Sequence, residues 1–80
     1  MRKNQLESRK AIILEKLEEI RDLMSDLRDE AEETLNEIEP YEGKDDLTPA
    51  QEERQDWFDS QREALDNAID DIDNIVSNLE

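Results

Sequence analysis

Residues 13–31 read ILEKLEEIRDLMSDLRDEA, and their apolar side chains recur at alternating steps of four and three residues. Such a seven-residue repeat places these side chains on one face of an α-helix and is typical of a coiled coil. Pro40 disfavours helical backbone at the residue before it, so we expect a first helix over residues 4–39. Its predicted core positions are Ile13, Ile20 and Leu27 at d, and Leu17, Met24 and Ala31 at a.

A second helix is expected after a short connection over residues 40–47, which contains the only glycine of the chain. Thr48, Pro49 and Gln51 form a helix-start signal, with the threonine as N-cap and the glutamine completing a capping box. We therefore predict a second helix over residues 48–79. Its predicted core positions are Phe58, Leu65, Ile72 and Leu79 at a, and Ala68 and Ile75 at d.

The short connection makes the two helices antiparallel neighbours. The predicted fold class is therefore all-α, a single domain over residues 1–80 that forms an antiparallel two-helix coiled-coil hairpin. In the register that best matches apolar residues, the facing pairs are Ile13 with Ile72, Ile20 with Leu65, and Leu27 with Phe58.

Further apolar residues flank the predicted seam, and three interpretations of them are open. They widen the seam of a monomer, they pair two copies into a four-helix bundle, or a different protein covers them. Leaving several large apolar side chains in water forgoes about 1.5–3 kcal/mol each and favours association. We therefore favour a homodimer. The flanking residues are Leu14, Leu35, Ile69 and Val76 on one side, and Leu23, Trp57 and Ala64 on the other.

The chain carries 25 acidic and 10 basic residues, for a net charge of −15, and has neither cysteine nor histidine. Such a charge repels nucleic acid and anionic membranes, so the expected partners are basic proteins. No disulfide is possible, and the commonest general base and metal ligand is missing. No apolar run approaches the length of a membrane span or a signal peptide, so we expect a cytoplasmic protein.

A continuous row of carboxylates runs along the second helix at steps of four and three residues, which places them on one stripe. We refer to it as the acidic stripe and expect it directly opposite the seam. More acids crowd the loop end of the hairpin. The candidate partner-binding residues are Glu52, Asp56, Asp59, Glu63, Asp66, Asp70 and Asp73 of the stripe, with Trp57, Glu33 and Glu37.

Two interpretations of the acidic stripe are open. It is a solvated outer face that only confers solubility, or it imitates nucleic acid. The stripe spans about 31 Å at about 1.5 Å per residue, and duplex DNA carries one charge per about 1.7 Å. We favour an inhibitor that occupies the basic groove of a nucleic-acid-binding protein, with a structural oligomerisation or adaptor coiled coil as the alternative. Trp57 either caps the seam or anchors an interface.

No catalytic, cofactor-binding or metal site is predicted. The run DDIDN from Asp70 lacks the glycine and the terminal glutamate of a calcium loop and lies within the second helix. The serines have no histidine to activate them. We therefore expect a protein that is not an enzyme and that needs no cofactor.

The turn residues Pro40, Glu42 and Gly43, together with the final segment ALDNAIDDIDNIVSNLE over residues 64–80, resemble small acidic helical-hairpin proteins carried by phages and mobile elements. Some small acidic phage proteins inhibit host nucleases or defence complexes by occupying their nucleic-acid sites. The resemblance thus implies an anti-defence or nuclease inhibitor, and it transfers no functional residue to this chain.

Overall fold

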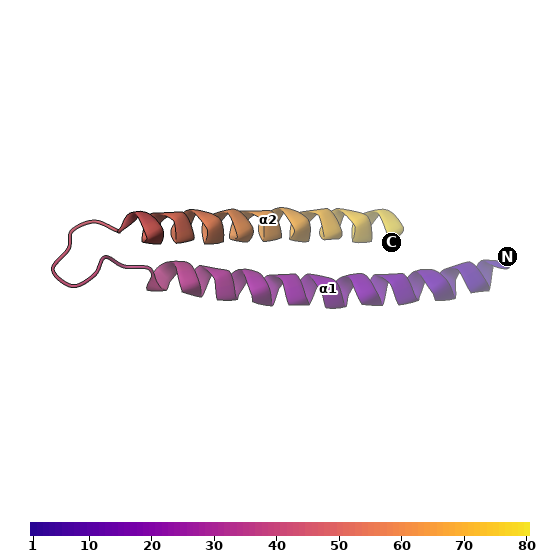
Figure 1. The fold of residues 1–80 in the computed structure, drawn as a ribbon. Helices are drawn as coiled ribbons and strands as arrows, with labels where there is room; N and C mark the ends of the chain where they lie inside the picture. Colours follow the sequence, from indigo (N-terminus) through magenta and orange to yellow (C-terminus); the bar gives the residue numbers. More distant parts are fainter.

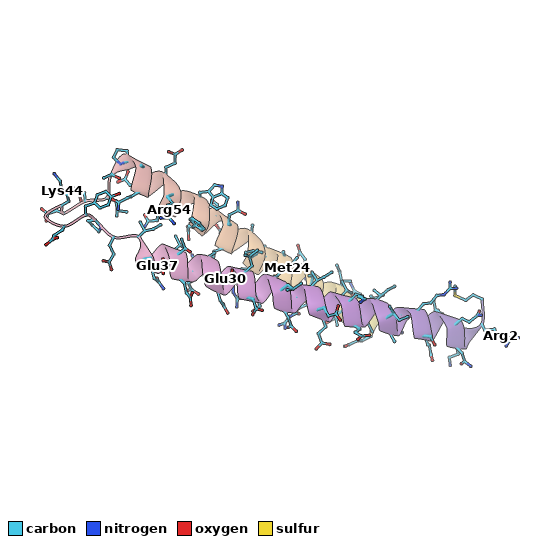
Figure 2. The ribbon with its side chains drawn as sticks, turned by 60° about the horizontal axis from the view of Figure 1, so that its bottom comes forward. Arg2, Met24, Glu30, Glu37, Lys44 and Arg54 are labelled. Atoms are coloured by element: carbon cyan, nitrogen blue, oxygen red, sulfur yellow. The ribbon has the colours of Figure 1, made fainter.

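The computed structural model describes all 80 residues as two helices, α1 (Lys3–Glu37) and α2 (Pro49–Leu79). The two helices lie side by side and antiparallel, joined by one loop, in a rod of 69 × 15 × 14 Å (Figure 1). The predicted all-α helical hairpin is confirmed. Side chains project from the rod along its whole length (Figure 2). We call the end near Lys44 the loop end and the end near Arg2 the open end.

The start of α2 follows the predicted capping box. The backbone N–H of Gln51 donates to Oγ1 of Thr48 at 3.2 Å, and the Thr48 N–H donates to Oε1 of Gln51 at 2.9 Å. The Gln51 side-chain amide also donates to the carbonyl oxygen of Glu39 at 2.7 Å. Because this last bond reaches back across the connection, it ties the segment that leaves α1 to the first turn of α2.

The end of α1 comes at Glu37, two residues before the predicted end at Glu39. Ile38 already has extended backbone, with φ −78° and ψ 108°, so the extended segment begins one residue before Glu39, the position that Pro40 itself restricts. The connection then turns at Gly43, whose φ of +82° suits glycine because other residues meet a steric penalty there.

The seam between the helices is rotated from the predicted one. The a positions are confirmed as the inner row, but they are joined by the residues one position after d. Ile13, Ile20, Leu27 and Ile75, predicted at d, are exposed, and only Ala68 of that set is half-buried. The buried or half-buried seam residues are Lys10, Leu14, Leu17, Met24, Arg28, Ala31 and Leu35 of α1, Ile38 just after it, and Gln51, Gln55, Phe58, Arg62, Leu65, Ile69, Ile72, Val76 and Leu79 of α2.

Ion pairs across the seam accompany the rotation. Apolar side chains occur both at d and in the adjacent flank, where Leu14, Leu35, Ile69 and Val76 stand, so either seam can bury the a row together with further apolar residues. The rotated seam additionally brings Arg21 and Arg28 of α1 within ion-pair distance of Asp73 and Asp66 of α2. Opposite charges that meet across a seam favour one alignment of two helices over its competitors.

The register is displaced as well. In the predicted register Arg21 faces Ala64, but in the structure it binds Asp73, nine residues further along α2. Glu80 then lines a groove with Ala11 and Leu14, and the first turns of α1 project past the end of α2 (Figure 1). The connection allows this shift because Ile38, Glu39 and Tyr41 fold back alongside the first turn of α2.

The rotated seam predicts which isoleucines of α2 carry stability. Ile69→Ala should lower the free energy of unfolding by about 2–4 kcal/mol, because the 6% exposed side chain leaves a cavity. Ile75→Ala, at 45% exposed, should cost less than half as much. Urea unfolding followed by circular dichroism in dilute solution measures both. If Ile75→Ala lowered the free energy of unfolding more than Ile69→Ala does, the rotated seam would be wrong and the unrotated seam would be supported.

Candidate functional site

The acidic stripe is exposed along the whole of α2, and all seven of its carboxylates lie at the surface. It does not lie opposite the seam, as predicted, but borders it. The reason is the rotation of the seam, which turns the stripe towards α1. Asp59, Asp66 and Asp73 form the inner row beside the seam, and Asp56, Glu63 and Asp70 form the outer row.

The inner row is partly neutralised by arginines. Oδ1 of Asp73 lies 2.7 Å from Nε of Arg21, and Oδ1 of Asp66 accepts a hydrogen bond from Nη1 of Arg28 at 3.0 Å. Asp59 accepts from Nη2 of Arg62, on its own helix, at 2.6 Å. These pairs are open to water and contribute little to stability, but they cancel the charge of three stripe carboxylates.

Arg28 has a second acidic neighbour. Its Nη2 donates to Oδ1 of Asp29 at 3.4 Å and to Oγ of Ser25 at 3.3 Å. The hydrogen bond to Asp66 raises the pKa of the guanidinium above its ordinary value; burial opposes this, and the contacts to Asp29 add to the rise. Because an arginine is charged throughout the physiological range in any case, this shift changes no protonation state there.

The outer row keeps its full charge. Asp56, Glu63 and Asp70 make no ion pair, and neither does Glu52 at the start of the stripe. Further carboxylates stand near the open end of the same side. Glu15 and Glu18 of α1 line one shallow groove together with Arg21, Asp73 and Glu80. The unpaired carboxylates of this side therefore lie on the outer row and beside this groove.

The structure does not bring Glu33, Glu37 and Trp57 together with the acidic stripe. Glu33 lies on α1 two residues from both Ala31 and Leu35, so it points away from the seam. Glu37 lines a groove at the loop end with Tyr41 and Arg54 (Figure 2). Trp57 faces the other side of the hairpin.

That other side is apolar. Sequence reasoning missed this surface because it assigned most of its residues to the seam. The sequence did contain a signal for this surface. Apolar side chains stand both at d and in the adjacent flank, and the seam can bury only one of these two sets, so the other set must stay at the surface. We call this surface the apolar face; its members are between 42% and 68% exposed, and they are Leu6, Ile13, Ile20, Leu23, Leu27, Trp57 and Ile75.

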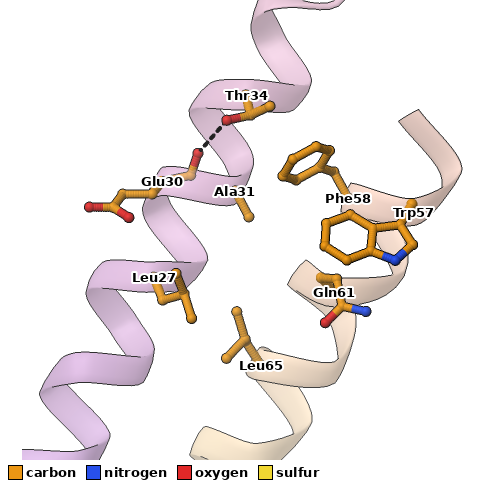
Figure 3. Close-up of a pocket in the computed structure, with 8 residues that line it drawn as sticks. All are labelled: Leu27, Glu30, Ala31, Thr34, Trp57, Phe58, Gln61 and Leu65. Carbon is orange, nitrogen blue, oxygen red and sulfur yellow. Dashed lines mark hydrogen bonds between the residues drawn. The ribbon is translucent and has the colours of Figure 1, made fainter. Parts of the chain in front are cut away.

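A groove of about 270 Å³ opens on the apolar face near the loop end (Figure 3). The Trp57 and Phe58 rings form one wall in an edge-to-face arrangement, with centroids 4.9 Å apart. The hydroxyl of Thr34 donates to the Glu30 carbonyl oxygen at 3.1 Å, so this polar group needs no ligand. The lining residues are Leu27, Glu30, Ala31, Thr34, Trp57, Phe58, Gln61 and Leu65.

Comparison with protein-family models, with curated proteins and with solved structures finds no match for this chain. Neither helix combines the length and apolar character needed to cross a membrane. No three histidine, cysteine, aspartate or glutamate side chains stand close enough together to hold a metal ion.

The pairing pattern predicts opposite effects for two neutralisations within the stripe. Glu63→Gln removes repulsion from carboxylates three and four residues away and should raise the free energy of unfolding by about 0.2–0.5 kcal/mol. Asp73→Asn removes the partner of Arg21 and should lower it by about 0.2–1 kcal/mol. Thermal unfolding at low ionic strength measures both. If both variants changed the free energy of unfolding in the same direction, the division of the stripe into a paired and an unpaired row would be wrong.

Proposed function

We propose that this chain is a non-enzymatic interaction protein that binds a basic, nucleic-acid-binding protein by imitating the charge of nucleic acid. The observation that carries the proposal is the outer row, Asp56, Glu63 and Asp70, which no basic side chain of the chain compensates. Carboxylates whose only role is solubility would gain by pairing with nearby lysines or arginines. The row instead stays charged and open.

The spacing of the outer row suits such a partner. Its members are seven residues apart, about 10.5 Å along the helix axis, and they stand on a rigid rod. A basic groove lined by lysines and arginines would attract the rod over a distance of the order of the Debye length, about 8–10 Å, and orient it before contact. We infer an inhibitor of a nuclease or DNA-binding protein, of the anti-defence kind.

The ion pairs narrow the set of residues that carry the proposed activity. Asp59, Asp66 and Asp73 already interact with arginines, and a partner would have to displace them. Glu52, Asp56, Glu63 and Asp70 are free to accept hydrogen bonds from a partner's basic side chains. Charge-assisted bonds of this kind are the stronger class of hydrogen bonds.

A second function rests on a different observation, the apolar face. A structural oligomerisation module would use this face to pair two hairpins into a four-helix bundle, with the carboxylates serving solubility. The two functions are compatible, because the apolar face and the outer row lie on different sides of the rod.

Two matched double variants test the proposed charge mimicry. Asp56→Asn/Glu63→Gln neutralises the outer row, and Glu19→Gln/Asp26→Asn neutralises two acids, also seven residues apart, on α1. Both change the net charge from −15 to −13. Immobilised protein should retain a nucleic-acid-binding protein from a lysate of the source cells at low salt, and duplex DNA or high salt should release it. The outer-row variant should lose at least about 90% of the captured protein, because two charge-assisted contacts are gone.

The α1 variant should keep most of this binding. Equal capture by both variants, or capture that salt and DNA leave unchanged, would refute charge mimicry. Capture of nothing would leave self-association as the function to pursue.

A further inference from the structure

We propose that the occupant of the apolar face is a second copy of this chain, docked antiparallel so that its open end covers the groove beside Trp57. This inference rests on the self-association described above and is independent of the basic partner.

The surface area of the hairpin supports a second copy. Only 3 of 80 residues are buried, and the chain exposes 6570 Å², whereas a compact monomer of 9.5 kDa exposes about 5,000 Å². The excess is about 1,500 Å². A stable protein–protein interface takes about 800 Å² from each partner. One hairpin therefore has more than enough uncovered surface for a dimer, and too few buried residues to form a large core alone.

The apolar face is also continuous enough to pair with itself. Leu6, Ile13, Ile20 and Leu27 follow one another at steps of seven residues along α1. Ile75 and Trp57 extend the face across the seam onto α2. A two-fold contact needs a surface that is complementary to itself, and a long row of aliphatic side chains satisfies this because each can interleave with the same row of a second copy.

Charge decides the orientation of the two copies. Residues 1–14, at the open end, carry four basic and one acidic residue, and residues 30–63, around the loop end, carry thirteen acidic and three basic residues. A parallel dimer would place the two acidic loop ends together. An antiparallel dimer places each basic open end beside the acidic loop end of the other copy, where Glu30, Glu53 and the single base Arg54 surround Trp57.

The displaced register points to the same orientation. The first two turns of α1, before Lys10, have no α2 opposite them, so Leu6 lies on a single exposed helix. The groove beside Trp57 lies at the other end of the same face. Ile20 falls about midway between them, so a two-fold axis near Ile20 brings Leu6 of one copy to the groove of the other.

Neighbouring isoleucines provide a matched test of the face. Ile13 belongs to the apolar face and Ile12 does not, although they are similarly exposed, at 50% and 56%. The wild-type chain should sediment as a dimer. Ile13→Asp should weaken dimerisation by at least about 100-fold, because the two-fold contact loses two apolar side chains, whereas Ile12→Asp should leave it within about threefold. Circular dichroism confirms that both variants stay helical.

A wild-type chain that is monomeric at all concentrations, or equal weakening by both variants, would overturn the proposal. These measurements use the protein alone, so their outcome does not depend on whether the outer row binds a basic partner. If the capture experiment failed but the chain still formed a dimer, only the proposed charge mimicry would be refuted.

Engineered cysteines test the orientation, since the chain has no cysteine of its own. Leu6→Cys/Trp57→Cys should give a disulfide-linked dimer on mild oxidation, seen as a doubled mass without reductant. Within one hairpin the two positions lie near opposite ends of a 69 Å rod and cannot join. Leu6→Cys alone should stay uncrosslinked. Efficient crosslinking by Leu6→Cys alone would establish the parallel dimer, in which the two Leu6 positions meet, and would overturn the antiparallel one; no crosslinking by the double variant would also overturn it.

Discussion

The contact between α1 and α2 is the only helix–helix interface in the molecule, and the way each helix is turned about its axis at that contact determines what every other side chain does. Ile69 and Ile72 are buried there, and together with Ala31 they are the whole buried core. Turning each helix by one position would exchange Ile69 for Ala68 and Val76 for Ile75, and would change the faces that meet water. The stripe and the apolar face are consequences of this one choice.

Ion pairs accompany this rotation of the helices and determine which carboxylates of the acidic stripe stay unpaired. Arg21 and Arg28 reach across the seam to Asp73 and Asp66, which aligns the helices in register but also cancels charge. Asp56, Glu63 and Asp70, one row further out, are beyond these arginines. The hairpin thus divides a uniform stripe of carboxylates into a row that serves its own folding and a row that is available to a partner.

The two proposed surfaces fit one molecule because they lie on different sides of the rod. Pairing of two hairpins through the apolar face would enlarge the buried core, which has three residues in one hairpin, to that of a four-helix bundle. It would also leave an outer row on each copy facing water. A dimer would therefore present two negative rows running in opposite directions, a symmetry that also relates the two strands of duplex DNA.

Much of this structure follows from the sequence by itself. The seven-residue repeat determined two helices, the capping box at Thr48 determined where α2 begins, and the glycine in the connection determined the hairpin. The exposed carboxylates along α2 also followed from spacing alone, because helical periodicity places them on one stripe. These features depend on residues close together in the chain.

Only the tertiary structure decided the rotation of the seam, the nine-residue shift of register, the pairing of the inner row and the existence of the apolar face. Apolar residues stand both at d and in the adjacent flank of each helix, so periodicity alone leaves two seams open. The choice between them depends on contacts such as Arg21 with Asp73, which join residues far apart in the sequence. A pattern read along one helix at a time contains no information about such contacts.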